Sequence, residues 1–182
     1  RPLRLLVLGG SLGAEALNSI LPELVVSVPS GSIQTLHQTG RRQFARTMQR
    51  YQQLGKDTEK THRVVAFIDE MGEAYQWADI VLSRSGASTV CEIAVAAKPA
   101  IFVPYPFHKD RQQLRNANWL HAAGAAEVVE QHNLDVDRLM QVLNRLMTDL
   151  GRLREMGLSA SKVAICDAHT RIADLCLEAA YG

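Results

Sequence analysis

The sequence has almost no surplus charge, few cysteines and no long apolar run. Lys and Arg number 20 against 19 Asp and Glu, so the formal net charge of +1 predicts neither a nucleic-acid partner nor an acidic membrane surface. Apolar runs such as residues 3–8, which Arg4 interrupts, are far shorter than the ~20 residues of a transmembrane helix. The chain opens without an initiator Met or a signal-peptide pattern, and a strand is expected almost at once. We therefore expect a fragment of a longer protein.

The sequence also has little that could hold a metal ion. Its three cysteines, Cys91, Cys166 and Cys176, form no C-x-x-C pair and have no histidine at metal-ligand spacing. We expect buried thiols in a reducing cytoplasm. Asp135 and Asp137 have the D-x-D spacing that binds a metal and diphosphate in some sugar transferases, but here they open a helix, where acids stabilise the dipole. We therefore predict a helix start at these residues and no metal site.

Short apolar runs alternate with longer stretches of helical period, which is typical of a parallel sheet with crossover helices. The 182 residues are 47% apolar, a composition typical of one globular domain that buries about 70% of the surface of its unfolded chain. The expected strands are residues 3–8, 33–37, 64–67, 80–83, 100–103 and 125–129. The expected helices are residues 14–28, 41–54, 70–77, 87–97 and 112–123. We predict an α/β fold with a Rossmann-like, doubly wound, six-stranded parallel sheet in residues 1–133 and a helical tail in residues 134–182.

A glycine-rich turn follows the first expected strand, with the sequence Gly9-Gly10-Ser11-Leu12-Gly13-Ala14. Ligands of such sheets lie beyond the carboxyl ends of the strands, where N–H groups at a helix start can approach a phosphate or diphosphate. The spacing is neither G-x-G-x-x-G nor that of a P-loop, and no acid lies between Glu23 and Asp57 to hold a nicotinamide ribose. The alternative is that these glycines serve only tight helix packing.

A second small-residue turn, residues 83–92, follows the fourth expected strand. Thr89 and Glu92 have the spacing of a capping box, which would make Glu92 a local helix cap. Alternatively, a carboxylate facing the cleft would accept two hydrogen bonds from the vicinal hydroxyls of a ribose. Both interpretations remain open at this point.

The loop after the fifth expected strand contains Pro104 and Pro106, which exclude a helix there. Six polar side chains follow in residues 108–113. An exposed charged loop is one interpretation. The paired amides of Gln112 and Gln113 also suit a neutral polyhydroxylated ligand, because each amide offers both a donor and an acceptor.

Together and in this order, five short motifs resemble one family, the GlcNAc transferases of peptidoglycan synthesis. The likeness covers the C-terminal half of those enzymes and runs from Leu5 to about Ala126, more weakly through the tail. Each motif alone is weak, but all five in register are specific. They are Gly9-Gly10-Ser11-Leu12-Gly13-Ala14 and residues 37–40 (HQTG), 67–71 (FIDEM), 84–92 (RSGASTVCE) and 108–113 (HKDRQQ).

The resemblance implies the C-terminal, donor-binding half of an inverting GT-B glycosyltransferase. Such enzymes move GlcNAc from UDP-GlcNAc to undecaprenyl-diphospho-MurNAc-pentapeptide (lipid I) and give lipid II, without a required metal or other cofactor. The half that binds the acceptor and supplies the general base would be absent here, so no catalytic residue is expected in this chain and little activity alone. The full-length protein would be cytoplasmic and peripheral on the inner face of the bacterial plasma membrane, with membrane contact through that absent domain.

The resemblance also implies a role for individual residues of this sequence. The diphosphate would meet the glycine-rich turn, uracil the end of the third strand, ribose Glu92, and the GlcNAc hydroxyls the paired amides. Residues of the fourth helix would provide a helix start over the phosphates and the sugar. The predicted site residues are Gly10, Ser11, Gly13, Phe67, Ile68, Ala87, Ser88, Thr89, Val90, Cys91, Glu92, Gln112 and Gln113.

Three alternatives remain open from the sequence. The chain could be the donor subunit of a split two-chain GlcNAc transferase, or a nucleotide-sugar-binding module without turnover. It could also be half of a UDP-GlcNAc 2-epimerase, which shares the fold; only the resemblance of the Gln112-Gln113 loop speaks against that.

Overall fold

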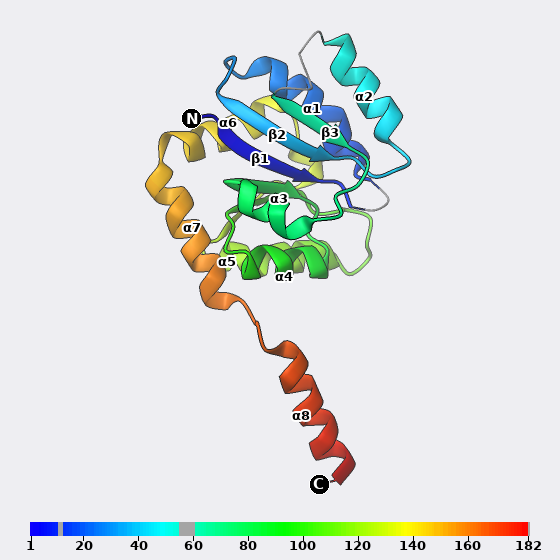
Figure 1. Cartoon of the computed structure of the whole chain (residues 1–182), viewed down its shortest axis with the longest axis vertical. Coiled ribbons are helices and arrows are strands. Elements are labelled where there is room, and N and C mark those ends of the chain that lie inside the picture. The colour runs from blue at the N-terminus through cyan, green and yellow to red at the C-terminus, as the bar shows by residue number, and fades with distance from the viewer. Residues whose placement is uncertain (11–12, 55–60, 182) are drawn as a thin grey trace.

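The chain folds around a parallel sheet, which the computed structural model describes over residues 1–10, 13–54 and 61–181 (Figure 1). Six strands of these residues lie in the order β3-β2-β1-β4-β5-β6, and the order reverses between β1 and β4. The predicted doubly wound sheet is therefore confirmed. The strands are β1 (Leu3–Leu8), β2 (Ile33–Gln38), β3 (His62–Val65), β4 (Ile80–Ser83), β5 (Ala100–Phe102) and β6 (Ala126–Val128).

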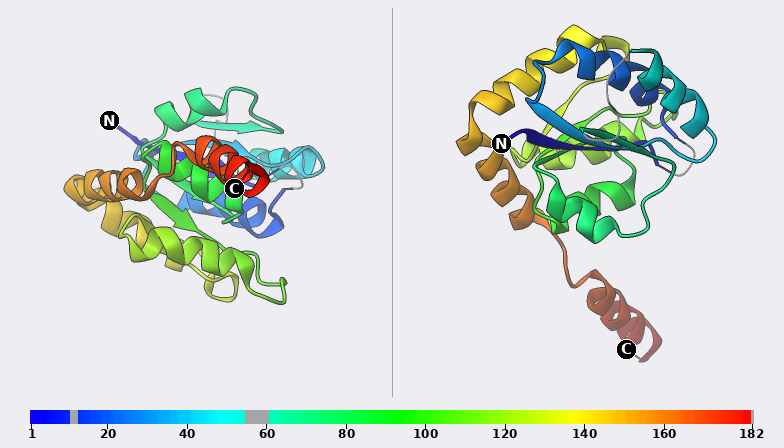
Figure 2. Two further views of the ribbon diagram at one scale, coloured as in Figure 1. Left: turned by 90° about the horizontal axis from the view of Figure 1, so that it is seen from below. Right: turned by 45° about the horizontal axis from the view of Figure 1, so that its top comes forward.

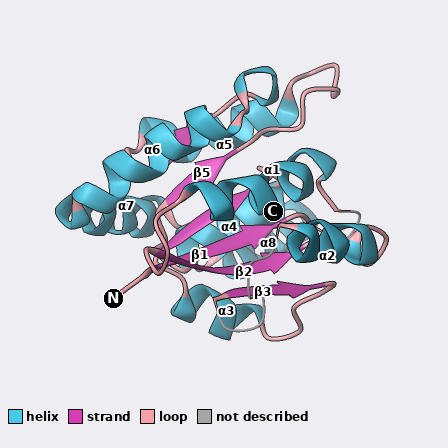
Figure 3. Cartoon of the chain, turned by 90° about the horizontal axis from the view of Figure 1, so that it is seen from above, coloured by secondary structure: helices cyan, strands magenta, loops and turns pink. Residues whose placement is uncertain are grey.

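Helices cover both faces of the sheet (Figures 1 and 3). One face carries α1 (Glu15–Ser27), α2 (Phe44–Gln53) and α6 (Val136–Thr148), which follows a short 3-10 turn at Gln131–Asn133. The other face carries α3 (Met71–Trp77), α4 (Ala87–Val95) and α5 (Gln112–Ala122). Helix α7 (Leu150–Val163) packs against both layers.

The central strand β1 shows why this sequence forms a sheet that is covered on both faces. Successive side chains of a strand point to opposite faces, and here both sets are apolar. Leu5 and Val7 lie in the core beneath α1 and α6, whereas Leu6 and Leu8 lie in the core beneath α3, α4 and α5. None of Leu5, Leu6 and Val7 has any exposed surface.

The carboxyl ends of the strands lie level with one another. Leu8 at the end of β1 is paired with Gln38 of β2 on one side and Ser83 of β4 on the other. Gln38 is in turn paired with Val65 of β3, and Ser83 with Phe102 of β5. The loops that follow these strands therefore meet at one edge, which we call the carboxyl edge.

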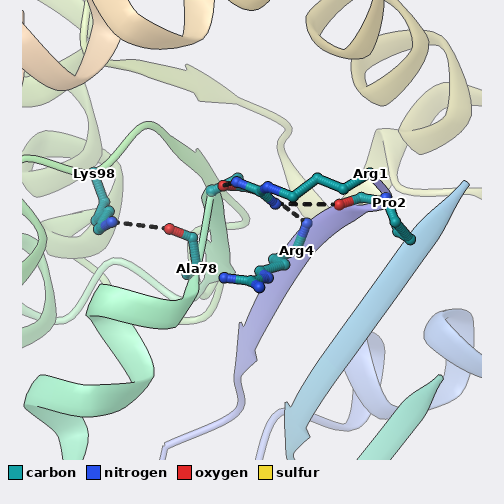
Figure 4. A network of polar contacts seen from close by, with 6 residues as sticks. Arg1, Pro2, Arg4, Ala78 and Lys98 are labelled. Atoms are coloured by element: carbon teal, nitrogen blue, oxygen red, sulfur yellow. Dashed lines mark hydrogen bonds and ion pairs between the residues drawn. The ribbon is translucent and has the colours of Figure 1, made fainter. Parts of the chain in front are cut away.

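At the opposite edge of the sheet, an ion pair and hydrogen bonds join the segments that precede the strands (Figure 4). Arg1 lies 2.7 Å from Asp79, and Asp79 also accepts a hydrogen bond from the Arg4 backbone N–H. Lys98 donates to the carbonyl of Ala78 over 2.9 Å. These contacts connect the start of β1 to the turns before β4 and β5.

The last helix, α8 (Ala168–Tyr181), extends away from the sheet, whereas α6 and α7 pack on it (Figures 1 and 2). Helix α8 has no buried residue, and Ile172, Leu175 and Leu177 are exposed on it. Across the described ranges, no helix is long and apolar enough to cross a membrane.

The prediction of buried cysteines is wrong, because all three thiols are exposed. Cys91 lies on the outer side of α4, whose core-facing residues are Val90, Ile93 and Ala94. Cys166 precedes α8 and Cys176 lies on it, so neither has a core to enter.

Candidate functional site

The carboxyl edge contains a cavity of about 1000 Å³, the upper end of the range for small-molecule sites. Strands β1 and β2 point towards this end, on the right of Figure 1. The cavity lies at the switch point between β1 and β4, where open α/β sheets bind their ligands. Its lining includes Gly10, Gly13, Ala14, Phe67, Ile68, Met71, Arg84, Gly86, Thr89, Glu92, Tyr105, Gln113 and Gln131.

The glycines after β1 have two different tasks. A Cβ on Gly13, whose φ is +81°, would lie 2.5 Å from the carbonyl oxygen of Thr39, and a Cβ on Gly40 would lie 2.5 Å from the nitrogen of Gly13. These two residues therefore allow two turns to touch, as the packing alternative expected. Gly10, with φ +75°, has open space where a Cβ would stand and lines the cavity. Ser11 lies outside the described residues.

A buried polar network supports this turn from below. His37 has no exposed surface; its Nε2 lies 3.0 Å from Asn18 Oδ1 and its Nδ1 lies 3.1 Å from the Tyr51 hydroxyl. Asn18 Nδ2 donates to the Thr39 carbonyl and to Gln43 Oε1. Asn18 Oδ1 is thus the acceptor, so Nε2 carries the proton of a neutral ring. Burial lowers the pKa of His37 to about 3.

Two helices begin at the cavity without a side-chain cap. The residues before their first turns, Ala14 for α1 and Gly86 for α4, line the cavity and offer no capping side chain. The N–H groups of a first turn have no partner within the helix and carry partial positive charge. The one acid in these turns, Glu15, lies 3.1 Å from Arg46, which offsets its charge.

Glu92 is not part of a capping box. Because α4 begins at Ala87, Thr89 is the third residue of the helix and cannot be its N-cap. Glu92 is exposed and lines the cavity, and its Oε2 accepts a hydrogen bond from the Tyr75 hydroxyl at 2.9 Å. No other described residue donates to the carboxylate. Glu92 therefore faces the cavity, and its contact with a ribose stays a prediction.

Arg84 places a positive charge in the cavity wall without a carboxylate partner among the described residues. Its guanidinium donates to the carbonyls of Val103 and Pro104 and to Gln131 Oε1, all neutral acceptors. It also lies 5.6 Å from the centre of the Tyr105 ring. Burial lowers the pKa of Arg84, but a guanidinium stays charged. An anionic ligand would offset this charge.

The two glutamines of the fifth loop differ in their placement. Gln113 lines the cavity, and its Oε1 accepts from the backbone N–H groups of Ser85 and Tyr105 at 3.3 and 3.0 Å. This leaves its amide donors to the cavity. Gln112 is exposed, and its backbone N–H donates to Asp110 Oδ1 at 3.2 Å.

The structure brings some of the predicted site residues together and leaves others apart. Those that line the cavity are Gly10, Gly13, Phe67, Ile68, Thr89, Glu92 and Gln113. Outside the lining lie Ala87, Ser88, Cys91 and Gln112, which are exposed, and Val90, which is buried in the core. Sequence reasoning missed Tyr105 and Gln131, which hold Arg84, and gave no role to Asn18 and His37. The only signal was the polar run HQTG after the second strand.

This fold is that of the C-terminal half of GT-B glycosyltransferases. Residues 4–172 match the glycosyltransferase family 28 C-terminal domain, and the chain belongs to that family. It is 45% identical over 179 residues to the UDP-N-acetylglucosamine--N-acetylmuramyl-(pentapeptide) pyrophosphoryl-undecaprenol N-acetylglucosamine transferase of Halorhodospira halophila. That alignment covers 98% of this chain and 49% of the relative, so the chain spans about half the length of the curated relatives it matches.

Solved structures agree with this assignment. MurG of Acinetobacter baumannii superposes with a TM-score of 0.84 at 36% identity, over 96% of this chain and 49% of that one. UDP-GlcNAc 2-epimerase of Neisseria meningitidis, over 97% of this chain and 44% of its own, reaches a TM-score of 0.67 at 12% identity. The latter likeness shows the shared fold alone.

Proposed function

We propose that this chain is the donor-binding half of an inverting GlcNAc transferase that acts on lipid I. The observation that carries the proposal is the cavity at the carboxyl edge. Its lining combines the uncapped starts of two helices, the Arg84 cation and the Glu92 carboxylate. The helix starts and the cation can bind the negative charge of a diphosphate, and the carboxylate can accept hydrogen bonds from ribose hydroxyls. Family membership and the MurG-like relatives support a nucleotide sugar as the ligand.

Each part of UDP-GlcNAc has a partner in this proposal. Uracil lies against Phe67 and Ile68 after β3, and the ribose hydroxyls donate to Glu92. The diphosphate lies between Gly10 and the starts of α1 and α4. The sugar hydroxyls face the amide of Gln113, with Gln112 close by in the sequence.

The chemistry assigned to this half is stabilisation of the leaving group. The C4 oxygen of the acceptor sugar forms a bond to C1 of GlcNAc while the bond from C1 to the diphosphate oxygen breaks. The acceptor proton goes to a base in the other half of the enzyme. Negative charge grows on UDP, and preorganised helix starts and Arg84 stabilise that charge without reorganisation.

The remaining parts of the proposal concern the whole protein. The other half would bind lipid I and contact the inner face of the plasma membrane, which makes the full-length protein cytoplasmic and peripheral. Within this chain, residues 1–133 would hold the donor, and the tail, residues 134–182, would cover apolar surface. The exposed apolar side chains of α8 are consistent with a missing neighbour.

Calorimetric titration of this chain with UDP-GlcNAc, UDP-GalNAc and UDP tests the donor site. Glu92→Ala should weaken all three ligands by roughly 10- to 150-fold, because charge-assisted hydrogen bonds to the ribose are lost. Gln113→Ala and Gln112→Ala should weaken only the two sugar-bearing ligands, and the larger loss should be at Gln113, which lines the cavity.

The matched control is Glu155→Ala, which removes an exposed acid of α7 far from the cavity and should leave all three affinities unchanged. An affinity for UDP that is unchanged in Glu92→Ala would refute the assigned ribose contact. No binding of any nucleotide would overturn donor binding by this chain. Conversion of UDP-GlcNAc without an acceptor would favour the epimerase. Binding without turnover, even with an acceptor-binding half present, would favour the non-catalytic module.

A further inference from the structure

Tyr75 is a buried tyrosine whose hydroxyl contacts Glu92, a residue of the cavity lining. It lies on α3 with 6% of its surface exposed and packs in the apolar core between the sheet and α4. Its hydroxyl donates to Glu92 Oε2 at 2.9 Å, and no other hydrogen bond to that hydroxyl comes from the described residues. The bond joins α3 to α4 and spans 17 residues of sequence.

The direction of this hydrogen bond is fixed by chemistry. An ionised carboxylate only accepts, so the phenol must donate. Burial and the negative charge of Glu92 raise the pKa of Tyr75, which keeps the phenol protonated at neutral pH. The tyrosine therefore occupies one acceptor position of Glu92 Oε2 and leaves Oε1 and the other lone pair of Oε2 to the cavity.

The bond also restrains a side chain that would otherwise be mobile. Glu92 is exposed and has no ion pair among the described residues, so solvent alone would leave its long side chain free to sample many rotamers. Tyr75 itself is held by the core and cannot move with it. A ligand that binds a carboxylate already held in place loses less conformational entropy on binding.

Helix α3, which contains Tyr75, also lies next to the proposed base subsite. It follows the turn of Phe67 and Ile68 within a few residues, and Met71 at its start also lines the cavity. Tyr75 therefore connects the helix behind the proposed base subsite to the carboxylate of the proposed ribose subsite.

We propose that Tyr75 is a positioning residue that orients the Glu92 carboxylate for the vicinal hydroxyls of the ribose. This rests on the proposed donor site and deepens it, because it assigns recognition of the diol to a pair of residues from two helices. Tyr75 does not touch the ligand in this arrangement.

The test is a double-mutant cycle of Tyr75→Phe and Glu92→Ala, read with UDP and with 2′,3′-dideoxy-UDP. Phenylalanine keeps the packing of the ring and removes only the hydroxyl. Tyr75→Phe should weaken UDP about 3- to 10-fold and leave the affinity for the dideoxy analogue within about twofold of wild type. In the Glu92→Ala protein, Tyr75→Phe should have no further effect on UDP.

The dideoxy analogue reports whether the variant still folds, and Tyr51→Phe is the matched control. Tyr51 is also buried, but its hydroxyl contacts His37 instead of Glu92, so its loss should leave the ratio of the two affinities unchanged. Equal weakening of both ligands by Tyr75→Phe would show a merely structural role and overturn the inference. The inference would also be overturned, with the donor site intact, if Tyr75→Phe left the ratio of the two affinities unchanged while Glu92→Ala brought it close to one. If wild type binds the two ligands equally, the ribose contact of Glu92 and this inference both fall, whereas nucleotide binding itself stands.

Discussion

Helices that begin at the carboxyl edge differ from those that begin in the tail. None of the edge helices α1 to α5 has a side-chain hydrogen bond at its N-cap. In the tail, Asp135 caps α6 by accepting from the Arg138 N–H at 2.7 Å, and Asp149 caps α7 by accepting from the Arg152 N–H at 2.8 Å. The prediction that Asp135 opens a helix is confirmed.

This difference shows how one chain divides helix stability and ligand binding between two regions. A capping side chain contributes about 1 kcal/mol and uses an N–H group of the first turn. Helices α6 and α7 of the tail are stabilised in this way. At the starts of α1 and α4 no side-chain cap uses these N–H groups, and they face a cavity large enough for a nucleotide sugar. Packing of the edge helices against the sheet stabilises them instead of caps.

Gly13→Ala should have the largest effect, because it disrupts the turn that sets the start of α1. The new methyl would meet the Thr39 carbonyl at a backbone angle that disfavours L-residues. We expect a loss of about 3–4 kcal/mol in the free energy of unfolding, measured by urea denaturation. Gly72→Ala is the control: it lies in α3 with open space at the Cβ position and should be neutral or stabilising by up to about 1 kcal/mol. Similar losses in both variants would contradict the close approach at Gly13.

Gly86→Asp would convert the start of α4 into a capped start like those of the tail. Gly86 has an extended backbone and open space for a side chain, so the aspartate fits. We expect a few tenths of a kcal/mol more stability and roughly 100-fold weaker UDP binding, because the carboxylate occupies the N–H groups and repels phosphate. Calorimetry and thermal unfolding measure the two effects. Unchanged UDP affinity, with Gly86→Ala as the reference, would show that α4 does not face a phosphate.

His37 should make the edge sensitive to acid. Its pKa of about 3 in the folded protein lies below the ordinary value of 6.5, so protons favour the unfolded chain as the pH falls below about 6.5. From pH 7 to pH 5 the wild type should lose about 2 kcal/mol more stability than His37→Gln, which cannot titrate there. Urea denaturation at several pH values measures this difference, and parallel curves would exclude a neutral buried ring.

Asp135→Ala should have the smallest effect and stay confined to the tail. Loss of the cap of α6 should lower the free energy of unfolding by about 1 kcal/mol and leave UDP affinity unchanged. Thermal unfolding and calorimetry on the same sample would show this. A change in UDP affinity would contradict the separation of the two regions.

Much of the fold followed from local pattern. Residues 3–8 and 80–83 were predicted with the bounds that the structure has, because apolar runs between turn residues leave few alternatives. The third strand was displaced by two residues, and the second helix begins at Phe44 instead of residue 41. Boundaries of this kind depend on hydrogen bonds to neighbouring elements.

The site, like the fold, was predictable from the sequence in part. The loops that line the cavity could be chosen from the sequence, since parallel strands bring their carboxyl ends to one edge. The side chains within those loops could not be ranked: Gln112 and Gln113 are adjacent in sequence, yet only Gln113 lines the cavity. The exposure of the cysteines was missed because it depends on which side of α4 meets the sheet and on the separation of α8 from it.

Local pattern was enough to predict the class of fold, the glycines that turn the chain after β1 and the acid that caps α6, because each depends on residues a few positions apart. Three other features became visible only in the packed molecule: Asn18 and Tyr51 bind His37, Tyr75 binds Glu92, and Arg84 has no carboxylate partner among the described residues. These are contacts between separate elements, and their formation depends on how the helices pack on the two faces of the sheet.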